Sequence, residues 1–108
     1  MFTISAVQQH GQSIHRLSGA LTIYAVAEAR PELAAVVAGQ KFTTLDLSEV
    51  DELDTAGVQL LLWLKREAGR QGATLALVLH SPAVVEVFDL LQVTAAFGDP
   101  ILIAPNPS

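Results

Sequence analysis

One stretch of sequence decides the fold, LDLSEVDELDTAG at residues 45–57, which runs directly into VQLLLWL at residues 58–64. It predicts a buried strand, a short acidic loop and the start of a strongly apolar helix. The loop ends in DTAG at residues 54–57, so one hydroxyl and small side chains would lie in the first helical turn. The first N–H groups of a helix have no partner inside it and lie at the positive end of its dipole. The stretch therefore predicts a contact point or a phosphate acceptor, although an N-cap at Asp54 or Thr55 explains the same residues.

The composition is typical of one small domain. The chain has 108 residues, of which 51% are hydrophobic, and its mean hydropathy is +0.43. This is enough for a single core. No apolar run approaches the ~18 residues of a membrane span, and no basic leader segment precedes the first strand pattern. Cysteine is absent, which excludes disulfides and thiolate chemistry and favours a cytoplasmic protein.

The charge balance argues against nucleic-acid binding. Six basic and 11 acidic residues give a formal net charge of −5, whereas phosphate contacts need clustered lysine and arginine. The one local basic group, Lys65, Arg66 and Arg70, is interpreted as the solvated C-terminal face of a helix, where cations suit the helix dipole.

Strands and helices are expected to alternate along the chain. Alternating apolar residues at 2–7 and 13–17 predict a β-hairpin that ends at Ser18-Gly19. The run over 21–37 has helical spacing, and Pro31 would kink this helix or start a later one. The further expected elements are a strand at 42–47, a helix from Thr55 to Gly69 or Gln71, a strand at 74–79, a helix beginning at Ser81-Pro82, a turn at 97–100 and a short strand at 101–103. This order predicts an α/β fold, with a mainly parallel or mixed sheet of four to five strands covered by helices.

The leucine-rich helix is expected to be packed on more than one side. Its run at 60–64 is apolar nearly all round, which is typical of a helix with several neighbours. Trp63 and Phe88 lie within apolar helical runs and are predicted to be core residues.

No catalytic or metal-binding constellation is present in the sequence. It has no Walker-type loop and no GxGxxG. His10, His15 and His80 are far apart in sequence, and nothing supplies a nucleophile with a base, so we expect no catalytic residue, no metal and no cofactor. His15 is expected to be an exposed strand residue.

The acidic cluster at residues 49–54 is interpreted as a solvated loop that faces a partner. Glu49, Asp51, Glu52 and Asp54 supply its charge, but their spacing matches no calcium-binding loop.

Together these residues resemble a STAS domain, the domain of anti-sigma factor antagonists and of the cytoplasmic tails of sulfate transporters. The resemblance rests on the strand at 45–47, the DTAG motif at 54–57, the leucine-rich helix that ends near Gly72, and the following strand, Ser-Pro and helix. It extends over essentially the whole chain and implies a single STAS domain at 1–104. The remaining residues, PNPS at 105–108, are expected to be a flexible tail.

The motif departs from the family's partner-switching members at one position. In those members it is Asp-Ser-Ser-Gly, and the second serine is phosphorylated by an anti-sigma factor kinase, which breaks binding to that kinase. A phosphate adds about −1.5 to −2 charge to a packed contact surface. Asp54 and Gly57 match the motif, Thr55 takes the first serine position, and Ala56 takes the position of the phosphorylated serine. The resemblance therefore leaves Thr55 as the candidate phosphoacceptor.

A second branch of the family is similar at the same place. The STAS subunit of the phospholipid-trafficking Mla ABC transporter has Asp-Thr-Gly-Gly there, and its threonine lies beside the ATPase subunit. Thr55 maps onto that threonine, and Ala56 replaces a glycine. A stand-alone STAS protein working beside signalling histidine kinases and a small-ligand carrier are further alternatives.

The resemblance implies a non-enzymatic bacterial signalling module of the anti-sigma factor antagonist type. Its partner would be an anti-sigma factor or a histidine-kinase-like ATPase domain; the alternative is a subunit that docks on an ABC transporter ATPase. Neither nucleic acid nor direct membrane insertion is expected, and a homodimer is left open. The expected partner-binding residues are Ser48, Glu49, Asp51, Asp54, Thr55, Ala56, Gly57, Val58 and Ser81.

Overall fold

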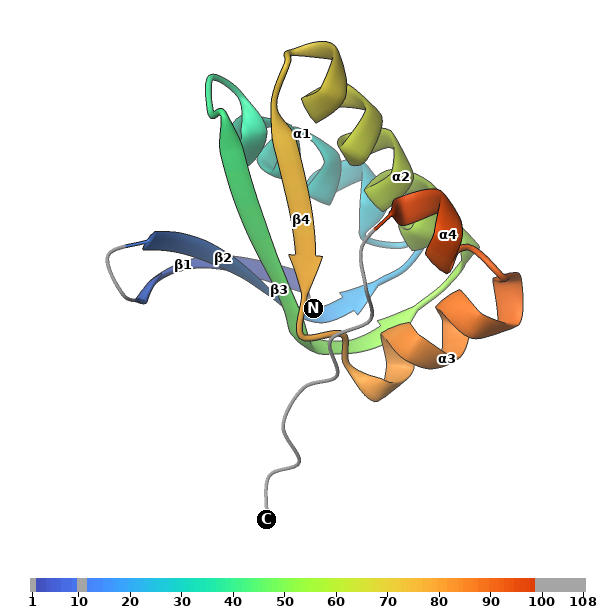
Figure 1. The fold of residues 1–108 in the computed structure, drawn as a ribbon. Helices are drawn as coiled ribbons and strands as arrows, with labels where there is room; N and C mark the ends of the chain where they lie inside the picture. Colours follow the sequence, from blue (N-terminus) through green and yellow to red (C-terminus); the bar gives the residue numbers. More distant parts are fainter. Residues whose placement is uncertain (1, 10–11, 99–108) are drawn as a thin grey trace.

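Helices and parallel strands alternate after an N-terminal hairpin (Figure 1). The computed structural model describes residues 2–9 and 12–98. In chain order its elements are β1 (Phe2–Gln9), β2 (Gln12–Leu21), α1 (Val26–Val37), β3 (Phe42–Leu53), α2 (Thr55–Arg70), β4 (Thr74–Val78), α3 (Pro82–Leu91) and α4 (Thr94–Phe97). His10, the strand expected at 101–103 and the tail at 105–108 lie outside the described residues.

The strands form one mixed sheet in the order β1-β2-β3-β4. β1 and β2 are antiparallel, whereas β3 runs parallel to both β2 and β4. This arrangement confirms the predicted α/β class, because parallel neighbours require crossover helices and α1 and α2 supply them.

Two helices cover one face of the sheet, and a third lies at one end of it. α1 and α2 pack against each other and against the strands, and α3 lies against the C-terminal half of β3 (Figure 1). α2 contacts α1, β3, β4 and α4, which confirms that it is packed on several sides. The core members contributed by the strands are Leu17, Leu21, Leu45, Leu47, Val50, Leu53, Leu75 and Leu77.

The acidic stretch at 48–53 is a strand, and its prediction as a loop is wrong. β3 continues to Leu53 because β2 pairs with it along the whole stretch. The register shifts twice: Arg16 pairs with Asp46 but Ser18 with Glu49, and a second shift follows Gly19. Each shift leaves one extra residue in β3, as in a β-bulge.

The two bulges explain the burial pattern of β3. A regular strand buries every second residue, and Leu45 and Leu47 follow that rule. Val50 and Leu53 are the next buried residues, each at an interval of three. The intervening acidic side chains face solvent on a strand that is otherwise well paired.

The hairpin and the first helix differ from expectation in their boundaries. Ser18-Gly19 does not end the second strand, since β2 runs to Leu21. α1 consequently begins only at Val26 and contains Pro31 in its interior. The short helix α4 was not predicted.

The burial of three side chains can be compared with its prediction from the sequence. Phe88 is buried, as predicted, and stacks on Phe97 with ring centroids 4.6 Å apart. Trp63 is only partly buried, so the prediction that it is a core residue is incomplete. His15 is half-buried rather than exposed, and its Nδ1 atom is buried without a hydrogen-bond partner.

The helices are short or amphipathic. Within residues 2–9 and 12–98, none is both long and apolar enough to cross a membrane.

Candidate functional site

The carboxylate of Asp54 organises the start of α2. Its Oδ1 atom accepts a hydrogen bond of 3.0 Å from the backbone N–H of Gly57, so Asp54 is the N-cap residue. Its Oδ2 atom accepts a second hydrogen bond, of 2.9 Å, from the backbone N–H of Ile23. One side chain therefore closes the first turn of α2 and holds the segment that joins β2 to α1.

Gly57 lets α2 approach the end of β2. A Cβ atom at this position would lie 2.1 Å from the carbonyl oxygen of Leu21 and 2.7 Å from Cδ1 of Leu53. No side chain fits there, because carbon atoms in contact lie about 3.5–4.0 Å apart. Gly57 is the last residue of the DTAG motif, and this close approach is the steric reason for a glycine there.

Thr55 is exposed, and two large apolar side chains are exposed in the segment that joins β2 to α1. Ile23 and Tyr24 are 59% and 95% exposed, and Asp54 holds Ile23 next to the start of α2. Large apolar side chains exposed together mark interaction surfaces. We call Ile23, Tyr24, Thr55 and Ala56 the Thr55 surface.

A groove between α1 and α2 continues from this surface. It has a volume of about 410 Å³ and is lined by Val26, Ala27, Arg30, Ala56, Gln59, Leu60, Trp63 and Arg66. The guanidinium carbon of Arg30 lies 4.3 Å from the centroid of the Trp63 ring, a cation–π contact. We call this the α1/α2 groove; Ala56 belongs to both surfaces.

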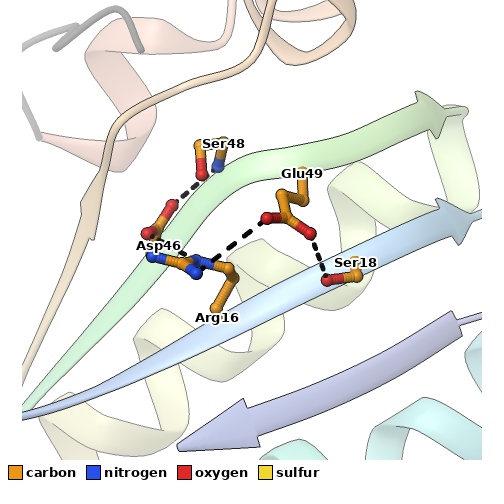
Figure 2. Close-up of polar contacts among 5 residues, drawn as sticks. All are labelled: Arg16, Ser18, Asp46, Ser48 and Glu49. Atoms are coloured by element: carbon orange, nitrogen blue, oxygen red, sulfur yellow. Dashed lines mark hydrogen bonds and ion pairs between the residues drawn. The ribbon is translucent and has the colours of Figure 1, made fainter. Parts of the chain in front are cut away.

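A polar network links β2 and β3 on the sheet face opposite to the buried Leu45 and Leu47. Figure 2 shows Arg16 between two carboxylates, with Nε 3.0 Å from Oδ2 of Asp46 and Nη1 3.9 Å from Oε2 of Glu49. The Ser18 hydroxyl donates a 3.2 Å hydrogen bond to Glu49. Glu49 is thus held in place although it is exposed.

The same network stabilises the first bulge of β3. Asp46 is only 2% exposed, and its Oδ1 atom accepts a 2.8 Å hydrogen bond from the backbone N–H of Ser48. A buried carboxylate needs such partners, because desolvation of an unpaired charge is costly. Arg16 and the Ser48 amide supply them at the point where the register shifts.

Ser81 makes two structural hydrogen bonds, of which the sequence pattern predicted one. Its hydroxyl accepts a 3.2 Å hydrogen bond from the backbone N–H of Val84 and is therefore the predicted N-cap of α3. The hydroxyl also donates a 2.6 Å hydrogen bond to the carbonyl oxygen of Val50. This second bond attaches α3 to the distal half of β3.

The residues expected to bind a partner differ in their exposure. The exposed members are Glu49, Asp51 and Thr55. The half-buried members are Ser48, Asp54 and Ala56. The buried members are Gly57, Val58 and Ser81. The buried members support the site from within and offer no side chain at its surface.

The expected residues also separate into two places. Asp54, Thr55, Ala56 and Gly57 lie together at the start of α2. Ser48, Glu49, Asp51 and Ser81 line a different depression of about 430 Å³, shared with the start of α3. The expected site is therefore two surfaces, and the Thr55 surface is the one with exposed apolar side chains.

Several residues of these surfaces were missed in the sequence. Ile23 and Tyr24 were included in a helical run, although the Thr22 that precedes them lies in the segment between strand and helix. Arg30 and Trp63 were missed because their pairing requires α1 and α2 to pack side by side. The exposed apolar Ile-Tyr pair was the one local signal.

Replacement of Asp54 by Ala is expected to lower the free energy of unfolding by about 1–2 kcal/mol. The variant loses the N-cap of α2 and leaves the Ile23 amide without its partner. Chemical denaturation measures the change. Asp54→Asn, which keeps one acceptor oxygen, should lose less; equal losses would contradict a capping role.

The described residues contain no group of three or more His, Asp or Glu side chains arranged to hold a metal ion. The Thr55 surface combines an exposed threonine with exposed apolar side chains, which suits contact with another macromolecule.

Comparison with known proteins agrees with this fold. A family model described as "Mlab, STAS domain" matches residues 5–103. An anti-sigma factor antagonist from Mycobacterium paratuberculosis is 21% identical, with a TM-score of 0.76 over 100% of this chain and 87% of that chain. The anti-sigma factor antagonist SpoIIAA in its unphosphorylated form is 22% identical, with a TM-score of 0.65 over 97% of this chain and 90% of that chain.

A further solved structure represents a phosphorylated protein of the same fold. The Bacillus cell fate determinant SpoIIAA in its phosphorylated form is 20% identical, with a TM-score of 0.64 over 98% of this chain and 93% of that chain. No curated protein sequence matches this chain. Because the family model covers nearly all of it, the chain belongs to the STAS domain family.

Proposed function

We propose that this chain is a non-enzymatic regulatory module that binds a protein partner through the Thr55 surface. The observation that carries the proposal is that Thr55 is exposed at the start of α2 and that Asp54 ties this start to the segment with the exposed Ile23 and Tyr24. Large apolar side chains that are exposed in a described segment favour such a patch as an interface. Similarity in fold to anti-sigma factor antagonists supports a regulatory role.

The partner in this proposal is an ATPase-type protein of the anti-sigma factor or histidine-kinase class. Thr55 would be the phosphoacceptor, since its hydroxyl is exposed and Ala56 has none. A phosphate at the first turn of α2 would be stabilised by the helix dipole. It would also add about −1.5 to −2 charge next to Ile23 and Tyr24 and so weaken an apolar contact.

A second candidate is a subunit that docks on the ATPase of a phospholipid-trafficking ABC transporter. The description of the matching family, "Mlab, STAS domain", favours it. In that case Thr55 would be a permanent, unmodified contact residue. Both candidates use the same surface, and both place the protein in the cytoplasm with its partner.

Replacement of Thr55 by Glu tests the shared surface. The variant is expected to weaken binding to the native partner about 30-fold, because a carboxylate is then desolvated at an apolar contact. Its melting temperature should stay close to that of the wild type, since Thr55 is exposed. Partner capture from native cells followed by titration of the purified partner measures the change.

Gln40→Glu is the matched control, because it adds the same charge at an exposed turn outside the Thr55 surface and the α1/α2 groove. Normal binding by Thr55→Glu would show that this surface is not the interface. Mass spectrometry of wild-type Thr55 separates the two candidates. A kinase partner with phosphorylated Thr55 supports the switch, and a transporter ATPase with unmodified Thr55 supports the second candidate.

A further inference from the structure

The α1/α2 groove concentrates positive charge in an acidic protein. The chain has a formal net charge of −5 and only six basic residues, yet two of them, Arg30 and Arg66, line this one groove. Arg16 and Arg70 are ion-paired with carboxylates. Among the described residues, Arg30 and Arg66 have no such partner.

The floor of the groove is apolar and partly open. Val26, Leu60 and Trp63 line it, and Trp63 remains only partly buried although it is a large aromatic side chain. Arg30 is held over the Trp63 ring, so its guanidinium is preorganised at the edge of the apolar floor. Apolar side chains flanked by ordered cations suit a ligand that is itself amphipathic and acidic.

We propose that the α1/α2 groove binds an acidic amphipathic helix of the protein partner; this rests on the function proposed above. A groove between two packed helices accepts a third helix, whose side-chain ridges fit between those of its neighbours. The apolar face of that helix would cover Leu60 and Trp63. Carboxylates at its edges would pair with Arg30 and Arg66, since a guanidinium binds a carboxylate with two parallel hydrogen bonds.

The position of the groove supports the same occupant. Ala56 lines the groove and follows Thr55 in the first turn of α2, so the groove begins next to the Thr55 surface. Glu28 and Glu32 do not line this groove; they line a different hollow, together with Phe2 and Tyr24. Charge complementarity of this kind selects partners and speeds association, and reversal of one partner's charges brings like charges together, which weakens binding.

The first experiment identifies what lies in the groove. A photo-reactive amino acid replaces Gln59, which is exposed and lines the groove, and a second variant carries it at Tyr24 as a reference on the Thr55 surface. The expected product from position 59 is a partner segment with an apolar stripe and clustered Asp or Glu. A segment without acidic residues, or cross-linking from position 24 alone, would overturn the proposal.

The second experiment tests the charges. Arg30→Glu/Arg66→Glu is expected to weaken partner binding about 30-fold, whereas Lys41→Glu/Arg70→Glu should have little effect. The control pair makes the same change in net charge, and its members are exposed and lie outside the groove. Equal effects of the two double variants would mean that overall charge, not the groove, determines binding.

Trp63 supplies a direct readout because it is the only tryptophan of the chain. A synthetic peptide copied from the cross-linked segment should change Trp63 fluorescence, and its version with every carboxylate replaced by an amide should bind much more weakly. Equal binding of the two peptides would exclude pairing with the arginines. If Thr55→Glu loses the partner but the arginine variant does not, the groove proposal fails and the proposed function stands. If neither loses it, both fail.

Discussion

Gly57→Ala is expected to lower the free energy of unfolding by about 3 kcal/mol, at the upper end of the usual cost of overpacking. The added methyl group would lie 2.1 Å from the carbonyl oxygen of Leu21. That oxygen belongs to the backbone of a paired strand, so it cannot move aside as a flexible side chain could. Urea denaturation of the purified variant measures the loss.

The same substitution at Gly69 is the control, and its expected sign is opposite. Gly69 lies in α2 as well, but a Cβ atom there would meet nothing within 4 Å. Gly69→Ala should therefore stabilise the protein by about 0.5–1 kcal/mol, the ordinary gain from Ala in a helix. If both variants gained stability, α2 would not approach β2 as closely as the structure shows.

This contrast also bears on experiments at the motif. A loss of partner binding in a Gly57 variant would follow from displacement of α2, without any contact between Gly57 and the partner. Thr55 is the better position for tests of binding, because its side chain is exposed.

Arg16→Met is expected to lower the free energy of unfolding by about 3 kcal/mol, near the lower bound for breaking a buried ion pair, since Arg16 is partly exposed. The variant keeps a long apolar side chain but leaves the carboxylate of Asp46 almost fully buried with the Ser48 amide as its remaining partner in the network. An unpaired buried charge is the costly part of this change.

The double variant Arg16→Met/Asp46→Asn separates the charge from the packing. It removes both charges but keeps an oxygen that can accept the hydrogen bond from Ser48. We expect it to recover at least half of the stability lost in Arg16→Met, because no buried carboxylate remains. A double variant as unstable as the single one would show that Arg16 stabilises the sheet mainly through packing.

The helices of the distal half were predictable because their signals are local. Ser81 followed by Pro82 predicts an N-cap and a first helical residue, and both predictions are confirmed. For α2 the sequence left the N-cap open between Asp54 and Thr55. The structure makes Asp54 the N-cap through its hydrogen bond from Gly57. The second hydrogen bond of Asp54 comes from Ile23, which lies 31 residues earlier in the chain and gives no local signal.

The acidic half of β3 could not be predicted from periodicity. A strand is identified in sequence by the alternation of buried and exposed residues. This alternation fails between Leu47 and Leu53, where the buried residues are three apart. The extra residues reflect the register against β2, which is a long-range property. With its exposed acidic side chains, this segment has the composition of a loop although it is a strand.

The motif residues of the candidate site could be predicted from the sequence, but the residues of the neighbouring groove could not. Thr55 and Asp54 stand out because they lie next to a strong helix start. Arg30 and Trp63 belong to helices separated by β3, and their contact exists only because α1 and α2 lie side by side. Sequence spacing contains no information about that distance.

The two bulges of β3 also determine where this domain can change its length. Loss of one residue at a bulge would restore regular pairing with β2 and leave the side chains beyond it on their original faces. At the first bulge the hydrogen bond between Asp46 and Ser48 would be the cost. A one-residue deletion between Phe42 and Leu45 would instead invert every side chain on one side of the gap. One-residue deletions accepted in β3 during evolution should therefore concentrate at residues 47–49 and 50–52.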